Sequence, residues 1–168
     1  MDVKKKKRHQ KSKAVKSLEN LAFEKLKERY PNFPYPIKEN YTDATSNGLT
    51  KCVIDFITLK GFHAERINST GAIKDKRTTS KDVLGNIRTI GNVEWIKSTT
   101  QNGTSDISAT IQGRSVKIEI KCEATGDNIQ SEVQKEYQRQ IENAGGTYII
   151  VRTFEEFYNW WHRKKATK

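Results

Sequence analysis

Three residues in the second half of the chain have side chains suited to cutting a phosphodiester bond. Asp106, Glu119 and Lys121 form the pattern D-x12-E-x-K. Two carboxylates held close together repel each other and need a cation, and oxygen ligands of this kind suit Mg²⁺ or Mn²⁺. A metal ion bound by Asp106, Glu119 and the backbone carbonyl of Ile120 would polarise a phosphate, and Lys121 would stabilise the charge of the transition state. The pattern alone is weakly specific, because these residue types are common on exposed sheet faces.

A β-hairpin is predicted to bring these residues together. Apolar and polar residues alternate on both sides of a turn that contains a glycine, which is typical of a hairpin. If residues 112–113 form the turn, Asp106 lies opposite Glu119. If residues 113–114 form it, Asp106 lies opposite Lys121. Both registers place the three side chains on one face, because side chains alternate along a strand. The alternative is an ordinary amphipathic hairpin with a polar outer face.

The remaining elements predict a mixed α/β domain built on a sheet. Apolar residues recur at helical spacing over 14–30, 46–60 and 129–144, and glycines follow the last two segments. Strands are predicted at 62–67, 93–96 and 147–151, and a final short helix carries an aromatic face made by Phe154, Phe157, Trp160 and Trp161. We expect these aromatic side chains to belong to the core. We place a basic N-terminal arm and helix at 1–40 and the main domain at 41–168.

The segment 68–92 is long and polar, and we predict an irregular loop there. It contains Lys74, Lys76 and Arg77. A polar connection of this length is uncommon in a compact domain unless it is functional or disordered. We expect a loop that faces DNA, with a solvated insertion as the alternative.

The charge distribution favours a polyanion as partner. The formal net charge is +11, and residues 1–38 hold 12 basic and 4 acidic side chains. Cations near a phosphate backbone release its counterions, which favours binding. The candidate contacts in the N-terminal block are Lys4, Lys5, Lys6, Lys7 and Arg8. A solvated cationic tail is the alternative reading.

The cysteine count and the lack of long apolar runs indicate a cytoplasmic protein. Cys52 and Cys122 are the only cysteines, and neither forms a C-x-x-C motif. We expect two free core thiols and no structural zinc site. No apolar run is long enough to cross a membrane, and no apolar segment follows the basic N-terminus as in a secretory signal. A reducing, cytoplasmic setting is expected.

Several short motifs resemble the PD-(D/E)xK nuclease superfamily and, within it, the VRR-NUC type. They are G-T-S-D-I at 103–107, I-E-I-K at 118–121, S-E-V-Q at 131–134, A-G-G at 144–146 and Y-I-I-V at 148–151. The resemblance covers roughly residues 45–157. Similar small nucleases occur in phages and mobile elements, and some resemble Holliday-junction resolvases. The resemblance therefore implies the cytoplasm of a bacterial or phage-infected host cell as the setting.

The resemblance implies a restriction-endonuclease-like core, with a mixed central β-sheet flanked by helices and a metal ion at the hairpin. Asp106 and Glu119 would be metal ligands and Lys121 the catalytic lysine. Gln134 matches a glutamine that shapes the site or touches the phosphate, although Ser131 and Gln134 also form a capping-box pattern.

Two positions depart from the family pattern. Ser105 stands where the family name has proline, at a position that need not bind metal. Asn47 stands where family members often carry glutamate. We expect Asn47 to be either an accessory ligand or a helix cap.

These observations predict a metal-dependent endonuclease acting on double-stranded or branched DNA, in recombination, replication or repair. The alternative is a catalytically inactive nucleic-acid-binding module on the same fold. A structural protein with a basic arm would explain the charge but not the hairpin. A junction-cutting enzyme must cut two strands symmetrically, so a homodimer is a further expectation.

Overall fold

The computed structural model describes residues 10–69, 71–98, 100–122 and 129–166. The expected DNA contacts in the N-terminal block lie outside these ranges. Four helices and eight strands follow one another in the described chain. Within these ranges, no helix is both long enough and apolar enough to span a membrane.

A mixed four-stranded sheet forms the centre of the molecule. Its strand order is β1 (His63–Arg66), β6 (Ile107–Ile111), β7 (Arg114–Ile120) and β8 (Thr147–Val151). The first three strands pair antiparallel, whereas β7 and β8 pair in parallel. A parallel pair needs a crossover connection, and the helix α3 (Glu132–Asn143) lies in that connection. The predicted mixed α/β class is confirmed.

The hairpin of β6 and β7 adopts the first of the two predicted registers. Ile111 pairs with Arg114, so Gln112 and Gly113 form the turn. Both residues have positive φ, 52° and 74°, as a type I′ turn requires. Extending this register by one pair places Asp106 opposite Glu119, because Ile107 pairs with Ile118.

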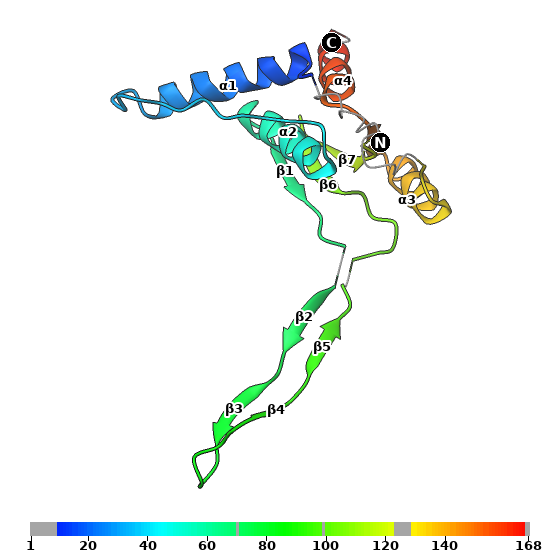
Figure 1. Cartoon of the computed structure of the whole chain (residues 1–168). Coiled ribbons are helices and arrows are strands. Elements are labelled where there is room, and N and C mark those ends of the chain that lie inside the picture. Colours follow the sequence, from blue (N-terminus) through cyan, green and yellow to red (C-terminus); the bar gives the residue numbers. More distant parts are fainter. Residues whose placement is uncertain (1–9, 70, 99, 123–128, 167–168) are drawn as a thin grey trace, which may run out of the picture.

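Helices and aromatic side chains make the core on one face of the sheet. The helices α1 (Lys13–Arg29), α2 (Ser46–Leu59) and α4 (Phe154–Ala166) pack together there (Figure 1). The ring of Phe56 in α2 meets Phe154, Phe157 and Trp161 of α4 edge to face, with centroids 5.8, 5.9 and 5.3 Å away. The expectation that the aromatic face belongs to the core is therefore confirmed.

The N-terminal helix shares this core. Val15 and Leu18 of α1 are fully buried, in the same cluster as Phe56. Ser12 caps the helix, since its side chain accepts a hydrogen bond from the backbone N–H of Val15. Cys52 and Cys122 are buried thiols, as predicted.

The prediction of an irregular loop at 68–92 is wrong, because most of this segment forms a β-ribbon. Its strands are β2 (Ala72–Asp75), β3 (Thr78–Lys81), β4 (Ile87–Ile90) and β5 (Val93–Ile96), paired as β2 with β5 and β3 with β4. We call residues 72–96 the arm. It leaves the sheet between β1 and β6 and projects away from the helices (Figure 1). All residues of its strands are exposed, so no buried apolar face reveals the strand period in the sequence.

Candidate functional site

A polar hollow of about 310 Å³ lies where the hairpin meets the start of α3. Asp106 comes directly before β6, and Glu119 lies near the end of β7. The other walls are the start of α3 and the two chain segments that lead into and out of the arm. The residues lining it are Ser69, Thr100, Gln101, Asn102, Gly103, Thr104, Asp106, Glu119, Ser131 and Gln134.

Glu119 is held on both carboxylate oxygens. Gln134 Nε2 donates a hydrogen bond to Oε1 at 2.5 Å, and the Lys121 ammonium lies 3.4 Å from the same oxygen. The Tyr148 hydroxyl donates to Oε2 at 3.4 Å. Only 3% of Glu119 and 4% of Lys121 is exposed. The carboxylate is therefore fixed in one orientation inside the protein.

Asp106 is anchored by the backbone around it. Its Oδ2 accepts a hydrogen bond from the Ile120 N–H at 2.9 Å, across the hairpin. Its carbonyl oxygen accepts one from the Ile67 N–H at 2.7 Å. The side chain thus lies beside Glu119, and the predicted sharing of one face by these two residues and Lys121 is seen in the structure.

The pKa of Glu119 reflects this crowding of charge. Burial raises it first, and the neighbouring carboxylate of Asp106 raises it further, to about 7. Lys121 and the Tyr148 hydroxyl act in the opposite direction. One ammonium therefore does not neutralise the pair, and the site can accommodate additional positive charge.

The donor set fits a hard divalent cation held by few protein ligands. Among the described residues, no three or more His, Cys, Asp or Glu side chains gather into a metal-binding group. The ligands that line the hollow are the carboxylates of Asp106 and Glu119. Mg²⁺ is commonly bound through one or two carboxylates, with water and phosphate oxygens completing its shell. The residues present fit that pattern.

Gln134 forms the predicted capping box and also contacts Glu119. Its Oε1 accepts a hydrogen bond from the Ser131 N–H at 2.9 Å, while Ser131 Oγ accepts one from the Gln134 N–H at 3.3 Å. This is the expected capping box, and α3 begins at Glu132 rather than near 129. The same amide donates its Nε2–H to Glu119. One side chain therefore links the end of a helix to the carboxylate.

The segment before Asp106 is fitted closely against α3. Gln101 Nε2 donates to Gln140 Oε1 at 3.0 Å. Gly103 has φ of +79°, and a Cβ at this position would lie 2.6 Å from the Val133 carbonyl oxygen. Only glycine permits this conformation and this approach without strain, which accounts for the glycine in the G-T-S-D-I motif.

Tyr148 is the site residue that the sequence analysis missed. It lies in β8, is 7% exposed, and its ring packs edge to face against Tyr137 at a centroid distance of 6.3 Å. Burial raises the pKa of its hydroxyl, so the hydroxyl remains a donor at neutral pH. The segment T-Y-I-I-V was read only as a buried apolar strand. The one available signal was a tyrosine in an otherwise aliphatic run, because a buried hydroxyl needs a partner.

The other candidate residues do not line the hollow. Asn47 is an exposed second residue of α2, and Thr45 rather than Asn47 caps that helix, so the cap prediction is wrong. Lys74, Lys76 and Arg77 lie on the arm, where Lys76 pairs with Glu94 and Arg77 with Asp75. Lys121 is brought to Glu119 but does not line the hollow.

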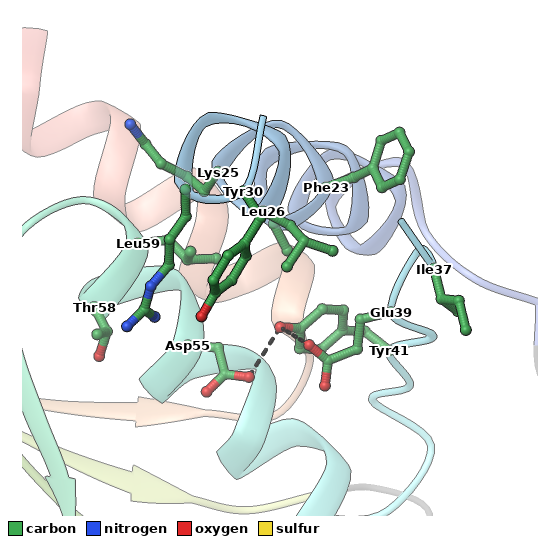
Figure 2. Close-up of a pocket in the computed structure, with 12 residues that line it drawn as sticks. Phe23, Lys25, Leu26, Tyr30, Ile37, Glu39, Tyr41, Asp55, Thr58 and Leu59 are labelled. Atoms are coloured by element: carbon green, nitrogen blue, oxygen red, sulfur yellow. Dashed lines mark hydrogen bonds between the residues drawn. The ribbon is translucent and has the colours of Figure 1, made fainter. Parts of the chain in front are cut away.

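A larger and more apolar hollow, of about 350 Å³, lies between α1, α2 and the connector that joins them. Figure 2 shows the Tyr41 hydroxyl between Glu39 and Asp55, to which it hydrogen-bonds at 3.0 and 2.9 Å. The Lys51 ammonium pairs with the same two carboxylates, at 2.8 and 2.5 Å. The acidic groups here are already paired with groups of the protein, so they are poorly placed to bind a ligand. The polar hollow at Glu119 is the better candidate site.

No known protein family matches the sequence, and a search of curated proteins finds no match.

Proposed function

We propose that this chain is a metal-dependent DNA endonuclease with a restriction-endonuclease-like core, of the PD-(D/E)xK type. The observation that carries the proposal is the pair Asp106 and Glu119, anchored side by side with Lys121 adjacent. Glu119 is buried with the half-buried Asp106 beside it, and two carboxylates held this close are unfavourable unless a cation joins them. A divalent cation explains why the sequence places both acids at this point of the sheet.

Different residues of the site would bind the metal, position a carboxylate and stabilise charge. Asp106, Glu119 and the Ile120 carbonyl would hold Mg²⁺ or Mn²⁺. When bound, such an ion polarises the scissile phosphate and lowers the pKa of the attacking water. Gln134 and Tyr148 keep the Glu119 carboxylate in place. The Lys121 ammonium stabilises negative charge that develops beside Glu119 in the transition state.

The shape and polarity of the site support a phosphodiester in a large polymer as substrate. The hollow is polar and is formed in part by Ser69 and by the segment 100–104. Hydroxyl, amide and backbone N–H groups are common partners of phosphate oxygens. The formal charge of +11 favours DNA, double-stranded or branched, as the polyanion. Recombination, replication or repair in a bacterium or phage is the setting we propose, with a cytoplasmic location.

The second candidate is a nucleic-acid-binding module without activity. The basic N-terminal block supports both functions equally. The two carboxylates favour the enzyme, because a pure DNA-binding protein gains nothing from acids that face a polyanion.

A cleavage assay with linear, flapped and four-way DNA tests the proposal, with Mg²⁺ or with a chelator. The informative variant is Asp106→Asn, since its amide oxygen can still accept the hydrogen bond from the Ile120 N–H. We expect cleavage only with the metal, and a loss of at least about 100-fold in the variant. DNA affinity, measured without metal, should be unchanged. Glu24→Gln on the exposed side of α1 is the matched control.

The binding-module alternative makes the opposite prediction. If neither protein cuts any of these DNA forms with Mg²⁺ or Mn²⁺, and both bind DNA equally, the catalytic assignment is wrong. If Asp106→Asn loses binding together with cleavage, the carboxylate does not act in the chemical step.

A further inference from the structure

The arm is a single regular ribbon. Ala72 pairs with Ile96 and Thr78 with Ile90, so the register continues without a shift from one strand pair to the next. The tip closes in the same register, because the Asp82 N–H donates to the Asn86 carbonyl at 2.9 Å. Asp82 Oδ1 also accepts from the Asn86 N–H at 2.8 Å. The arm therefore has a defined structure along its whole length.

The arm exposes an unusual amount of apolar surface. Eight large apolar side chains are exposed along it: Ile73, Val83, Leu84, Ile87, Ile90, Val93, Trp95 and Ile96. Two of them, Ile73 and Trp95, lie directly opposite each other and are 67% and 61% exposed. With about 150 Å² for a fully exposed large side chain, the eight together expose about 800 Å². This area is divided between the two faces and the tip of the ribbon, because side chains alternate along each strand: Ile73 and Trp95 share one face, whereas Ile90 and Ile96 lie on the other.

A two-stranded ribbon is marginally stable in water on its own. The arm also has no third strand on either edge within the described residues. Such edges carry backbone donors and acceptors that are open to pairing with another chain. Contact with another molecule would therefore stabilise the arm, by burying its apolar side chains and pairing its strand edges.

The charges of the arm favour a protein over a nucleic acid as that molecule. The arm holds five basic and three acidic side chains. Each acidic side chain is paired within the arm: Asp75 with Arg77 at 2.7 Å, Asp82 with Arg88 at 3.5 Å, and Glu94 with Lys76. These pairs reduce the positive field that would attract phosphates, whereas the apolar side chains gain most from a dry protein contact.

We propose that the arm is a dimerisation element and that its partner is the arm of a second copy of this chain. A standard stable interface buries about 800 Å² on each partner, and two arms reach this area when each covers both faces of the other. A two-fold axis lets one surface serve both copies, because the same patch meets itself. Ile73 and Trp95 lie in the strand pair at the base of the arm, and the contact extends from there toward the tip.

The test is the mass of the full-length protein in solution, measured by sedimentation equilibrium without DNA or metal. The chain has a mass of 19.3 kDa, and we expect a species of twice that mass. Ile73→Ser with Trp95→Ser should give the monomer, with a dimer dissociation constant raised by at least about 100-fold. The matched control is Tyr35→Ser with Ile37→Ser, which removes two apolar side chains of the connector that are still more exposed, 82% and 83%.

The possible results distinguish between the binding partners that the arm could have. A wild-type monomer at concentrations of about 100 µM, well above the dissociation constants of typical specific dimers, would overturn the proposal. So would a dimer that survives the Ile73 and Trp95 substitutions while circular dichroism shows an intact fold. A monomer whose DNA affinity falls with the same substitutions would identify nucleic acid as the occupant instead. The nuclease proposal is unaffected by any of these results, since no cleavage is measured.

Discussion

Removing the charge of Glu119 should stabilise the protein at neutral and alkaline pH when no divalent metal is present. Burial and the charge of Asp106 raise the pKa of Glu119 from 4.5 to about 7. The folded protein therefore keeps a proton between these pH values that the unfolded chain has released. The free energy of unfolding falls as the pH rises through this range, and is constant again above the folded pKa.

The expected size follows from the difference between the two pKa values. One pKa unit corresponds to about 1.4 kcal/mol, so the Glu119 ionisation destabilises the folded state by about 3 kcal/mol in total. About 2.5 kcal/mol of this loss falls between pH 5 and pH 8. Glu119→Gln has no carboxylate and should not show this loss, and its amide oxygen can still accept the hydrogen bond from Gln134.

The assay is urea unfolding in the presence of chelator, followed by circular dichroism at several pH values. Wild type and Glu119→Gln should have similar stability near pH 5, and the variant should be the more stable one near pH 8. Glu24→Gln, which removes an exposed carboxylate, should follow the wild type. Parallel curves for wild type and Glu119→Gln would refute the reasoning, because the carboxylate would then ionise in the folded protein as it does in water.

Four further predictions concern the site and its support. Mg²⁺ should raise the melting temperature of the wild type more at pH 8 than at pH 6, because protons compete for Glu119, and equal shifts would contradict this. Tyr148→Phe should raise the pKa of Glu119 and lower cleavage by about 2–3-fold at pH 7 but not at pH 9, as read from the pH profile of kcat/KM. Gly103→Ala should lower the free energy of unfolding by about 1–3 kcal/mol, because its Cβ meets the Val133 carbonyl, and an unchanged urea midpoint would be inconsistent with that contact. Deletion of residues 1–9 should flatten the salt dependence of DNA affinity in fluorescence anisotropy, and an unchanged slope would exclude contacts from this block.

The hairpin could be predicted from the sequence because its signal is local. Alternating apolar residues identified both strands and placed Asp106 with Glu119 in either register. The choice between registers depended on the turn, where Gln112 adopts φ of 52° beside Gly113. A glutamine in that conformation leaves no mark in the sequence, so only the structure separates the two alternatives.

The arm and Tyr148 were missed for different physical reasons. The arm has two exposed faces, so polar and apolar residues mix on both, and its pairing joins residues as distant as Ala72 and Ile96. Tyr148 acts through a contact with Glu119 that depends on the parallel pairing of β7 and β8. Sequence periodicity reports which face is buried, but not which side chains meet across strands.

Because Gln134 contacts both the Ser131 N–H and Glu119, the first turn of α3 should respond when a ligand moves the Glu119 carboxylate. A single orientation of its amide satisfies both the Ser131 N–H and the Glu119 oxygen, and a flipped amide would lose both hydrogen bonds. Any ligand that rotates Glu119 must therefore either break the contact with Nε2 or pull the amide away from the helix end. The Ser131 amide proton should then exchange faster with solvent, so its NMR resonance would follow occupancy of the site even in a variant that cannot turn over substrate.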